Sequence, residues 1–100
     1  MKNAVSMYCT GFCPYCHMAE RLLHARGVSE ILKIRIDLEP ARRAEMITRT
    51  GQRTVPQIYI GELHVGGFDE LAALDRGGRL VPMLRTEFPR AGANGDETNG

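Results

Sequence analysis

Two cysteines separated by two residues, Cys13 and Cys16, have the spacing that most directly suggests chemistry. Residues three apart on a helical turn are neighbours, so these thiols can form a disulfide with each other. Pro14 suits the first helical turn, which places Cys13 at the helix N-terminus. Free N–H groups and the helix dipole there stabilise a thiolate and lower the thiol pKa. Cys13 is therefore the expected nucleophile, and the less exposed Cys16 the resolving thiol.

The sequence leaves other uses of this pair open. Cys9 and His17 lie close in sequence to this pair, so the four residues suggest a zinc site. A closed zinc site, however, needs four well-spaced ligands, and no second Cys-x-x-Cys is present. Cys13, Cys16 and His17 also match the attachment string of c-type haem, which requires an oxidising compartment and export. Cys16 alone is compatible with an inert core cysteine. The position at a helix start favours redox chemistry over all three, so no metal site is expected.

Cys9, the third cysteine, has no partner in this scheme. It lies four residues before Cys13, on the loop side of the expected site. We interpret it as a bystander thiol, with oxidative dimerisation or regulation as the alternative. Three cysteines are too few for a disulfide-stapled secreted domain. The thiols are therefore expected to work reduced, in the cytoplasm.

The first elements that would position the thiols are a strand and a helix. Residues 4–8 form a short apolar run typical of a buried strand. Residues 14–26 have a helical apolar stripe, followed by a C-capping Gly27. The stripe consists of Cys16, Ala19, Leu22 and Leu23.

The next elements repeat this alternation. Residues 32–37 alternate with a period of two, which predicts a strand. Pro40 opens a helix to Arg49 that ends at Gly51, with an inner side of Ala44, Met46 and Ile47.

The last part of the pattern is a hairpin followed by a helix. Residues 58–60 and 63–65 predict two strands around Gly61-Glu62. A third helix follows, with Leu71, Ala72 and Leu74, and residues 80–84 add a last helical turn. The order β-α-β-α-β-β-α predicts an α/β, thioredoxin-like fold with a four-stranded mixed sheet flanked by helices.

Length and charge limit the possible functions. One hundred residues make one domain, which we assign to residues 1–87, with a disordered tail at 88–100. Thirteen basic against twelve acidic residues argue against a nucleic-acid binder that depends on a bulk basic field. No apolar run approaches the ~20 residues of a membrane span, and the first residues resemble mature protein rather than a signal peptide.

Two further motifs lie after the second helix. In Thr54-Val55-Pro56 the proline opens a strand after a polar loop, which makes it a candidate for a cis peptide bond, with a trans proline at the start of an edge strand as the alternative. Such a bent segment would turn the Val55 backbone toward the thiols and offer a main-chain pairing surface. Gly66-Gly67 allows close backbone approach at the start of the third helix, where Asp69 can cap the helix or accept a ligand's ammonium group.

Together, Cys13-Pro14-Tyr15-Cys16, Thr54-Val55-Pro56 and Gly66-Gly67-x-Asp69 resemble the dithiol glutaredoxins of the thioredoxin superfamily, most closely the bacterial glutaredoxin 3 subfamily. The resemblance covers residues 4–84. It implies a glutathione-dependent thiol–disulfide oxidoreductase that acts as a monomer on glutathionylated or disulfide-bonded proteins. Glutathione would be the co-substrate, and no tightly bound cofactor is implied.

The resemblance also implies residue roles. Cys13 would carry the glutathionyl group, and Cys16 would resolve protein disulfides. The Val55 backbone would pair with the cysteinyl unit of glutathione. The implied glutathione-binding residues are Tyr15, Arg49, Arg53, Thr54, Val55, Pro56, Gly67, Phe68 and Asp69. A basic cluster of Arg42, Arg43, Arg49 and Arg53 would steer the anionic tripeptide.

The sequence departs from the family at two positions. Thr10 replaces a common Lys that contacts the glutathione carboxylate and stabilises the thiolate, and Phe68 replaces a common Cys. Two alternatives remain: a redoxin reduced by thioredoxin reductase, and a dimeric iron–sulfur module held through Cys13 and two glutathiones. The Gly66-Gly67-x-Asp69 motif disfavours the first, and Pro14 with a resolving Cys16 disfavours the second.

Overall fold

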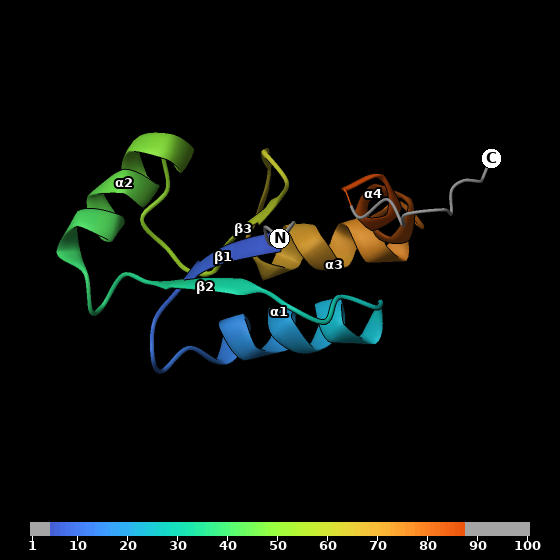
Figure 1. Cartoon of the computed structure of the whole chain (residues 1–100), viewed down its shortest axis with the longest axis horizontal. Coiled ribbons are helices and arrows are strands. Elements are labelled where there is room, and N and C mark those ends of the chain that lie inside the picture. The colour runs from blue at the N-terminus through green and yellow to red at the C-terminus, as the bar shows by residue number, and fades with distance from the viewer. Residues whose placement is uncertain (1–4, 88–100) are drawn as a thin grey trace.

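A four-stranded mixed sheet forms the centre of the molecule, in a computed structural model that describes residues 5–87 (Figure 1). β1 (Val5–Cys9) pairs in parallel with β2 (Leu32–Arg35) and antiparallel with β3 (Gln57–Ile60), which pairs antiparallel with β4 (Leu63–Gly66). The strand order β2-β1-β3-β4 confirms the predicted sheet. The predicted tail lies outside the described residues.

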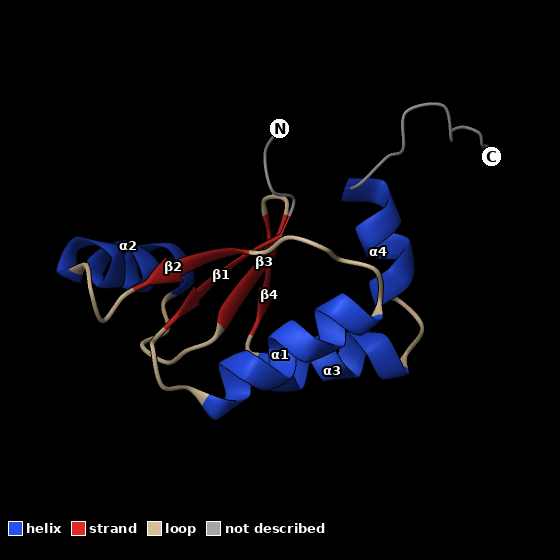
Figure 2. Cartoon of the chain, turned by 60° about the horizontal axis from the view of Figure 1, so that its bottom comes forward, coloured by secondary structure: helices blue, strands red, loops and turns tan. Residues whose placement is uncertain are grey.

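Helices cover both faces of this sheet (Figure 2). α1 (Pro14–Ala25) and α3 (Phe68–Arg76) lie side by side on one face, and α4 (Leu80–Glu87) packs against α3. α2 (Pro40–Thr50) lies on the opposite face. None of the described helices is long and apolar enough to cross a membrane.

The two faces have separate cores because side chains alternate along a strand. Val5, Met7 and Cys9 point to the face of α1 and α3, which we call the apolar face. Buried side chains from the helices complete this core: Ala19, Leu23, Leu71, Leu80 and Leu84. Tyr8 points to the opposite face, which we call the aromatic face, where the buried core consists of Tyr8, Ile36, Met46 and Tyr59.

Three expectations about packing and element length were wrong. Ala44 is exposed, because Met46 and Ile47 alone supply the inner side of α2. β2 ends at Arg35 rather than at Asp37, and it is an edge strand in which Leu32 is half exposed. The last helix is a full element of eight residues rather than one turn.

Candidate active site

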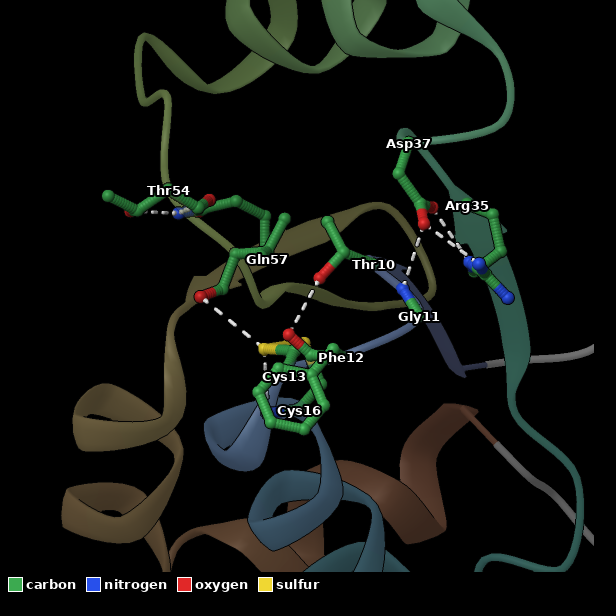
Figure 3. Close-up of a disulfide and its surroundings, with 10 residues drawn as sticks. Thr10, Gly11, Phe12, Cys13, Cys16, Arg35, Asp37, Thr54 and Gln57 are labelled. Atoms are coloured by element: carbon green, nitrogen blue, oxygen red, sulfur yellow. Dashed lines mark hydrogen bonds and ion pairs between the residues drawn. A yellow bond between two sulfur atoms is a disulfide. The ribbon is translucent and has the colours of Figure 1, made fainter.

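Cys13 and Cys16 form a disulfide at the N-terminus of α1, with their Cα atoms 5.2 Å apart (Figure 3). Cys13 is the N-cap residue, and its sulfur accepts a hydrogen bond of 3.2 Å from the Cys16 backbone N–H. This confirms the predicted helix-start position. The predicted difference in exposure is small, because Cys13 is 7% and Cys16 5% exposed. What distinguishes the two sulfurs is that the helix start donates to Cys13.

The Val55–Pro56 peptide bond is cis, as predicted, and it lies against the disulfide. The Val55 carbonyl oxygen is 4.0 Å from the Cys13 sulfur. The Val55 N–H has no hydrogen-bond partner in the described part of the chain. An extended peptide bound next to the sulfur therefore finds a free main-chain donor there.

Gly67 brings the start of α3 close to this segment. A Cβ atom at Gly67 would meet the Pro56 carbonyl oxygen at 3.4 Å. The cap of α3 differs from our expectation: Glu70, not Asp69, accepts the Gly67 N–H, at 2.8 Å. Glu70 is placed to do so because the third helical residue reaches back to the N-cap. Asp69 is exposed, and its carboxylate has no ion pair among the described residues.

Aromatic side chains border the disulfide on its solvent side. Tyr15 is 57% exposed, and its ring centroid lies 6.4 Å from that of Phe68. Phe12, directly before Cys13, is 91% exposed. These rings give the site an apolar rim across which a thiol-bearing substrate can lie.

Two of the four arginines in the predicted basic cluster, Arg42 and Arg49, are engaged elsewhere. Arg49 donates to the Tyr8 hydroxyl at 2.8 Å, and its guanidinium lies 4.1 Å from the Tyr59 ring centroid. Arg42 pairs with Glu45 at 3.0 Å. Arg53 is exposed, without an ion pair in the described region. Of the two arginines among the implied glutathione-binding residues, Arg53 is thus the one left unengaged.

The loop before Cys13 is fixed by an ion pair at the end of β2. The Asp37 carboxylate accepts the Gly11 N–H at 3.1 Å and pairs with Arg35 at 2.7 Å. The Arg35 guanidinium, followed by the Gly11 N–H, holds the pKa of Asp37 well below its usual range. A side chain at Gly11 would displace the Arg35 guanidinium from its place beside Asp37. Thr10 itself makes only a weak contact, at 3.4 Å, with the Phe12 carbonyl.

Cys9 points into the apolar core rather than toward the loop side where we expected it. It is 3% exposed and shares a cavity of about 220 Å³ with Cys16. Burial raises the pKa of the Cys9 thiol, so it stays protonated at neutral pH. A buried neutral thiol is a poor nucleophile, which accords with a bystander role.

Sequence reasoning missed a polar network behind the cis-proline segment. Gln57 is the one buried polar side chain among the described residues, 3% exposed. Its amide nitrogen donates to the Thr54 carbonyl at 3.0 Å and contacts the Thr54 hydroxyl at 3.3 Å. Its amide oxygen lies 2.7 Å from Nε2 of His64. A glutamine at the start of a buried strand was the available signal, since buried polar groups need partners.

The described residues contain no group of three or more His, Cys, Asp or Glu side chains that could hold a metal ion.

Comparisons with known proteins agree on one family. The glutaredoxin family model matches residues 5–65. A glutaredoxin of Neisseria meningitidis serogroup A is 56% identical over 82 residues, covering 82% of this chain and 96% of the relative. Glutaredoxin 3 of Escherichia coli K12 is 49% identical over 81 residues, covering 81% and 96%.

Solved structures give the same result. A buckwheat glutaredoxin–glutathione complex superposes with a TM-score of 0.78 at 35% identity, covering 85% of this chain and 79% of that one. The glutaredoxin of Brucella melitensis superposes with a TM-score of 0.72 at 45% identity, covering 82% and 88%.

Proposed function

The chain belongs to the glutaredoxin family of glutathione-dependent thiol–disulfide oxidoreductases, and from that premise we propose that Cys13 is the nucleophile that carries the glutathionyl group. The observation that supports this most strongly is the 3.2 Å hydrogen bond from the Cys16 N–H to the Cys13 sulfur. In the reduced protein the same donor and the helix start stabilise a thiolate on Cys13.

The proposed reaction with a glutathionylated protein has two exchanges. The Cys13 thiolate attacks the glutathione sulfur of the mixed disulfide, and the protein leaves as a thiolate that takes up a proton. The thiolate of a second glutathione then attacks the glutathione sulfur on Cys13. Oxidised glutathione leaves, and the Cys13 thiolate is restored.

The reaction with a protein disulfide uses both cysteines. Cys13 attacks one sulfur of the substrate, forming a mixed disulfide and releasing one substrate thiolate. The Cys16 thiolate attacks the Cys13 sulfur, which releases the second substrate thiolate and leaves the Cys13–Cys16 disulfide seen in this structure. Two glutathione molecules reduce it again, and are themselves regenerated at the expense of NADPH.

The proposed glutathione site surrounds the Cys13 sulfur. The Val55 N–H pairs with the cysteinyl unit, and Thr54 and cis-Pro56 shape that segment. Free N–H groups at the start of α3, at Phe68 and Asp69, hold the γ-glutamyl carboxylate. The Asp69 carboxylate, without an ion pair in the described part of the chain, accepts the ammonium group. Gly67 permits the close approach, Tyr15 borders the tripeptide, and Arg53 rather than the stacked Arg49 meets the glycine carboxylate.

We also propose the oligomeric state, the protein substrates and the compartment of the reaction. One chain supplies every proposed site residue, so we propose a monomer that acts on glutathionylated or disulfide-bonded proteins. A reduced glutathione pool is needed for turnover, which favours the cytoplasm. The proposed cycle needs no tightly bound cofactor.

Single serine substitutions of the two cysteines test the mechanism. We expect Cys13→Ser to reduce activity to background with a glutathionylated peptide and with a protein disulfide, because the nucleophile is lost. Cys16→Ser should keep substantial activity with the glutathionylated peptide and lose the protein disulfide activity. Oxidation of NADPH coupled through glutathione reductase measures both. Equal loss of both activities in Cys16→Ser would exclude the glutathionyl-carrying mechanism.

A further inference from the structure

We propose that Gln57 and His64 are positioning residues that aim the Val55 N–H at the bound substrate. The inference rests on the proposed function, in which that N–H pairs with the cysteinyl unit of glutathione. Among the described residues neither side chain forms a hydrogen bond with the disulfide, and Gln57 bonds instead to Thr54, so both act through the Thr54–Val55 peptide group.

The first step is the geometry of one peptide plane. The Thr54 carbonyl and the Val55 N–H belong to the same planar peptide group, in which the two bonds point in opposite directions. Gln57 donates to the Thr54 carbonyl oxygen at 3.0 Å and so fixes the orientation of that plane. The Val55 N–H is thereby held pointing away from Gln57, without a partner in the described part of the chain.

The Gln57 side-chain amide is held in one orientation by Thr54 and His64. The Thr54 carbonyl can only accept a hydrogen bond, so the amide nitrogen of Gln57 must face it. The amide oxygen then faces Nε2 of His64, at 2.7 Å, and this nitrogen must carry a hydrogen. His64 donates through Nε2 whether the ring is neutral in that form or protonated. The Gln57 amide is thus held at both ends and cannot turn without losing two bonds.

The third step is what fixes His64. Its ring lies 5.1 Å from the Tyr59 ring, and Arg49 stands 4.1 Å from the same Tyr59 centroid. The hairpin register places His64 opposite Tyr59 on β4. His64 on β4 therefore holds Gln57, and Gln57 in turn holds the Thr54 carbonyl beside the cis-proline.

The test compares two substrates that differ in the group Val55 can bind. One cysteine-containing peptide is prepared as a mixed disulfide with glutathione, and the same peptide as a mixed disulfide with cysteamine, which has no peptide group. Reduced protein is mixed with each in excess under single-turnover conditions. The variants are Gln57→Met, which keeps volume without hydrogen bonds, and His64→Phe, which keeps a ring against Tyr59.

For Gln57→Met we expect the half-saturating concentration of the glutathionyl peptide to rise about three- to tenfold, the range of one hydrogen bond. The cysteaminyl peptide and the rate of Cys13 alkylation by iodoacetamide should not change. His64→Phe should give a smaller effect of the same kind, and His64→Gln, which keeps a donor, should restore it in part.

Other outcomes have distinct meanings. If both substrates are affected equally, or neither is, in a folded variant, the positioning role is wrong. If Gln57→Met fails to fold, His64→Phe carries the test alone, because that side chain is only half buried. If the wild-type protein itself shows no preference for the glutathionyl peptide, the proposed function fails rather than this inference.

Discussion

The two faces of the sheet are built from different chemistry, although they share the same strands. On the apolar face, Val5, Met7 and Cys9 pack with Ile58 and Ile60 against three helices, and the disulfide belongs to that core. On the aromatic face, Tyr8 and Tyr59 bury their rings under α2, while their neighbours Arg49 and Glu45 stay partly exposed and form polar contacts.

The difference indicates a division of labour within the site. The apolar face fixes the cysteines through α1, by non-directional burial that sets where the helix lies. In the proposed site, the aromatic face fixes the main chain that would meet the substrate, by hydrogen bonds that set the direction of individual groups. Substitutions on the first face should therefore lower stability most, and substitutions on the second should change recognition at a smaller cost in stability.

The largest expected effect is that of Met7→Ala on the apolar face. Met7 is fully buried, and its truncation should lower the free energy of unfolding by about 2–5 kcal/mol through lost burial and an unfilled cavity. Urea unfolding of the reduced protein measures this. A loss below about 1 kcal/mol would mean that this face is not the main source of stability.

Tyr8→Phe is the matched substitution on the other face, at the next residue of the same strand. The Tyr8 hydroxyl donates to Glu45 and accepts from Arg49. Burial, followed by the Glu45 hydrogen bond, raises the Tyr8 pKa, so the hydroxyl is protonated at neutral pH. Its removal should cost about 1 kcal/mol, because Glu45 and Arg49 regain contact with water. The same urea experiment checks this, and a loss equal to that of Met7→Ala would abolish the distinction between the faces.

The apolar face was the more predictable of the two. Period-two and helical apolar patterns, with Pro14 and Gly27 at the ends of α1, are local signals, and they predicted the order of the elements along the chain and the place of Cys13. The contacts of Arg49, by contrast, could not be predicted from local sequence signals. Because Arg49 lies close to Arg53 in the sequence, the two arginines predict an anion-binding site. The contacts of Arg49 with Tyr8 and Tyr59 depend instead on how α2 crosses the sheet.

The polar network was partly accessible to sequence reasoning. The predicted two-residue loop at Gly61-Glu62 pairs Tyr59 with His64, as observed. That register places His64 near Gln57 on one face, so the pair could have been proposed from the hairpin alone. The contact of Gln57 with Thr54, by contrast, depends on the path of the chain around Pro56, which no residue pattern specifies.

A pH experiment tests how the loop between β1 and α1 is anchored. Asp37 has a depressed pKa in the folded protein, caused first by Arg35 and then by the Gly11 N–H. Its carboxylate therefore contributes stability above its ordinary pKa of about 4, and this contribution is lost as the pH falls below that value. Asp37→Asn should be slightly less stable at pH 7 and should lose less on acidification.

Thermal unfolding of wild type and Asp37→Asn at pH 7 and at about pH 3 measures the difference. The exposed ion pair is screened by solvent, so the effect should be smaller than that of Tyr8→Phe. Glu62→Gln provides a matched control, because Glu62 is exposed and its carboxylate has no ion pair among the described residues. If Asp37→Asn and wild type lose the same thermal stability between pH 7 and about pH 3, this carboxylate does not anchor the loop.

The smallest expected effect is that of restoring a charge with Thr10→Lys. Thr10 makes only a 3.4 Å contact with the Phe12 carbonyl, so its replacement removes little. An ammonium group three residues before Cys13 should attract the thiolate and a glutathione carboxylate through water, where one charge pair contributes less than about 1 kcal/mol. We expect a two- to fivefold lower KM for the glutathionylated peptide, by conversion of that energy, and faster iodoacetamide alkylation of Cys13 near neutral pH.

Both gains should shrink at high salt, because exposed charges are screened, whereas Thr10→Gln should show neither. If Thr10→Lys changes neither rate nor KM at low salt, the helix N-terminus and the Cys16 N–H suffice to hold the thiolate, and recognition depends on the main-chain groups positioned from the aromatic face.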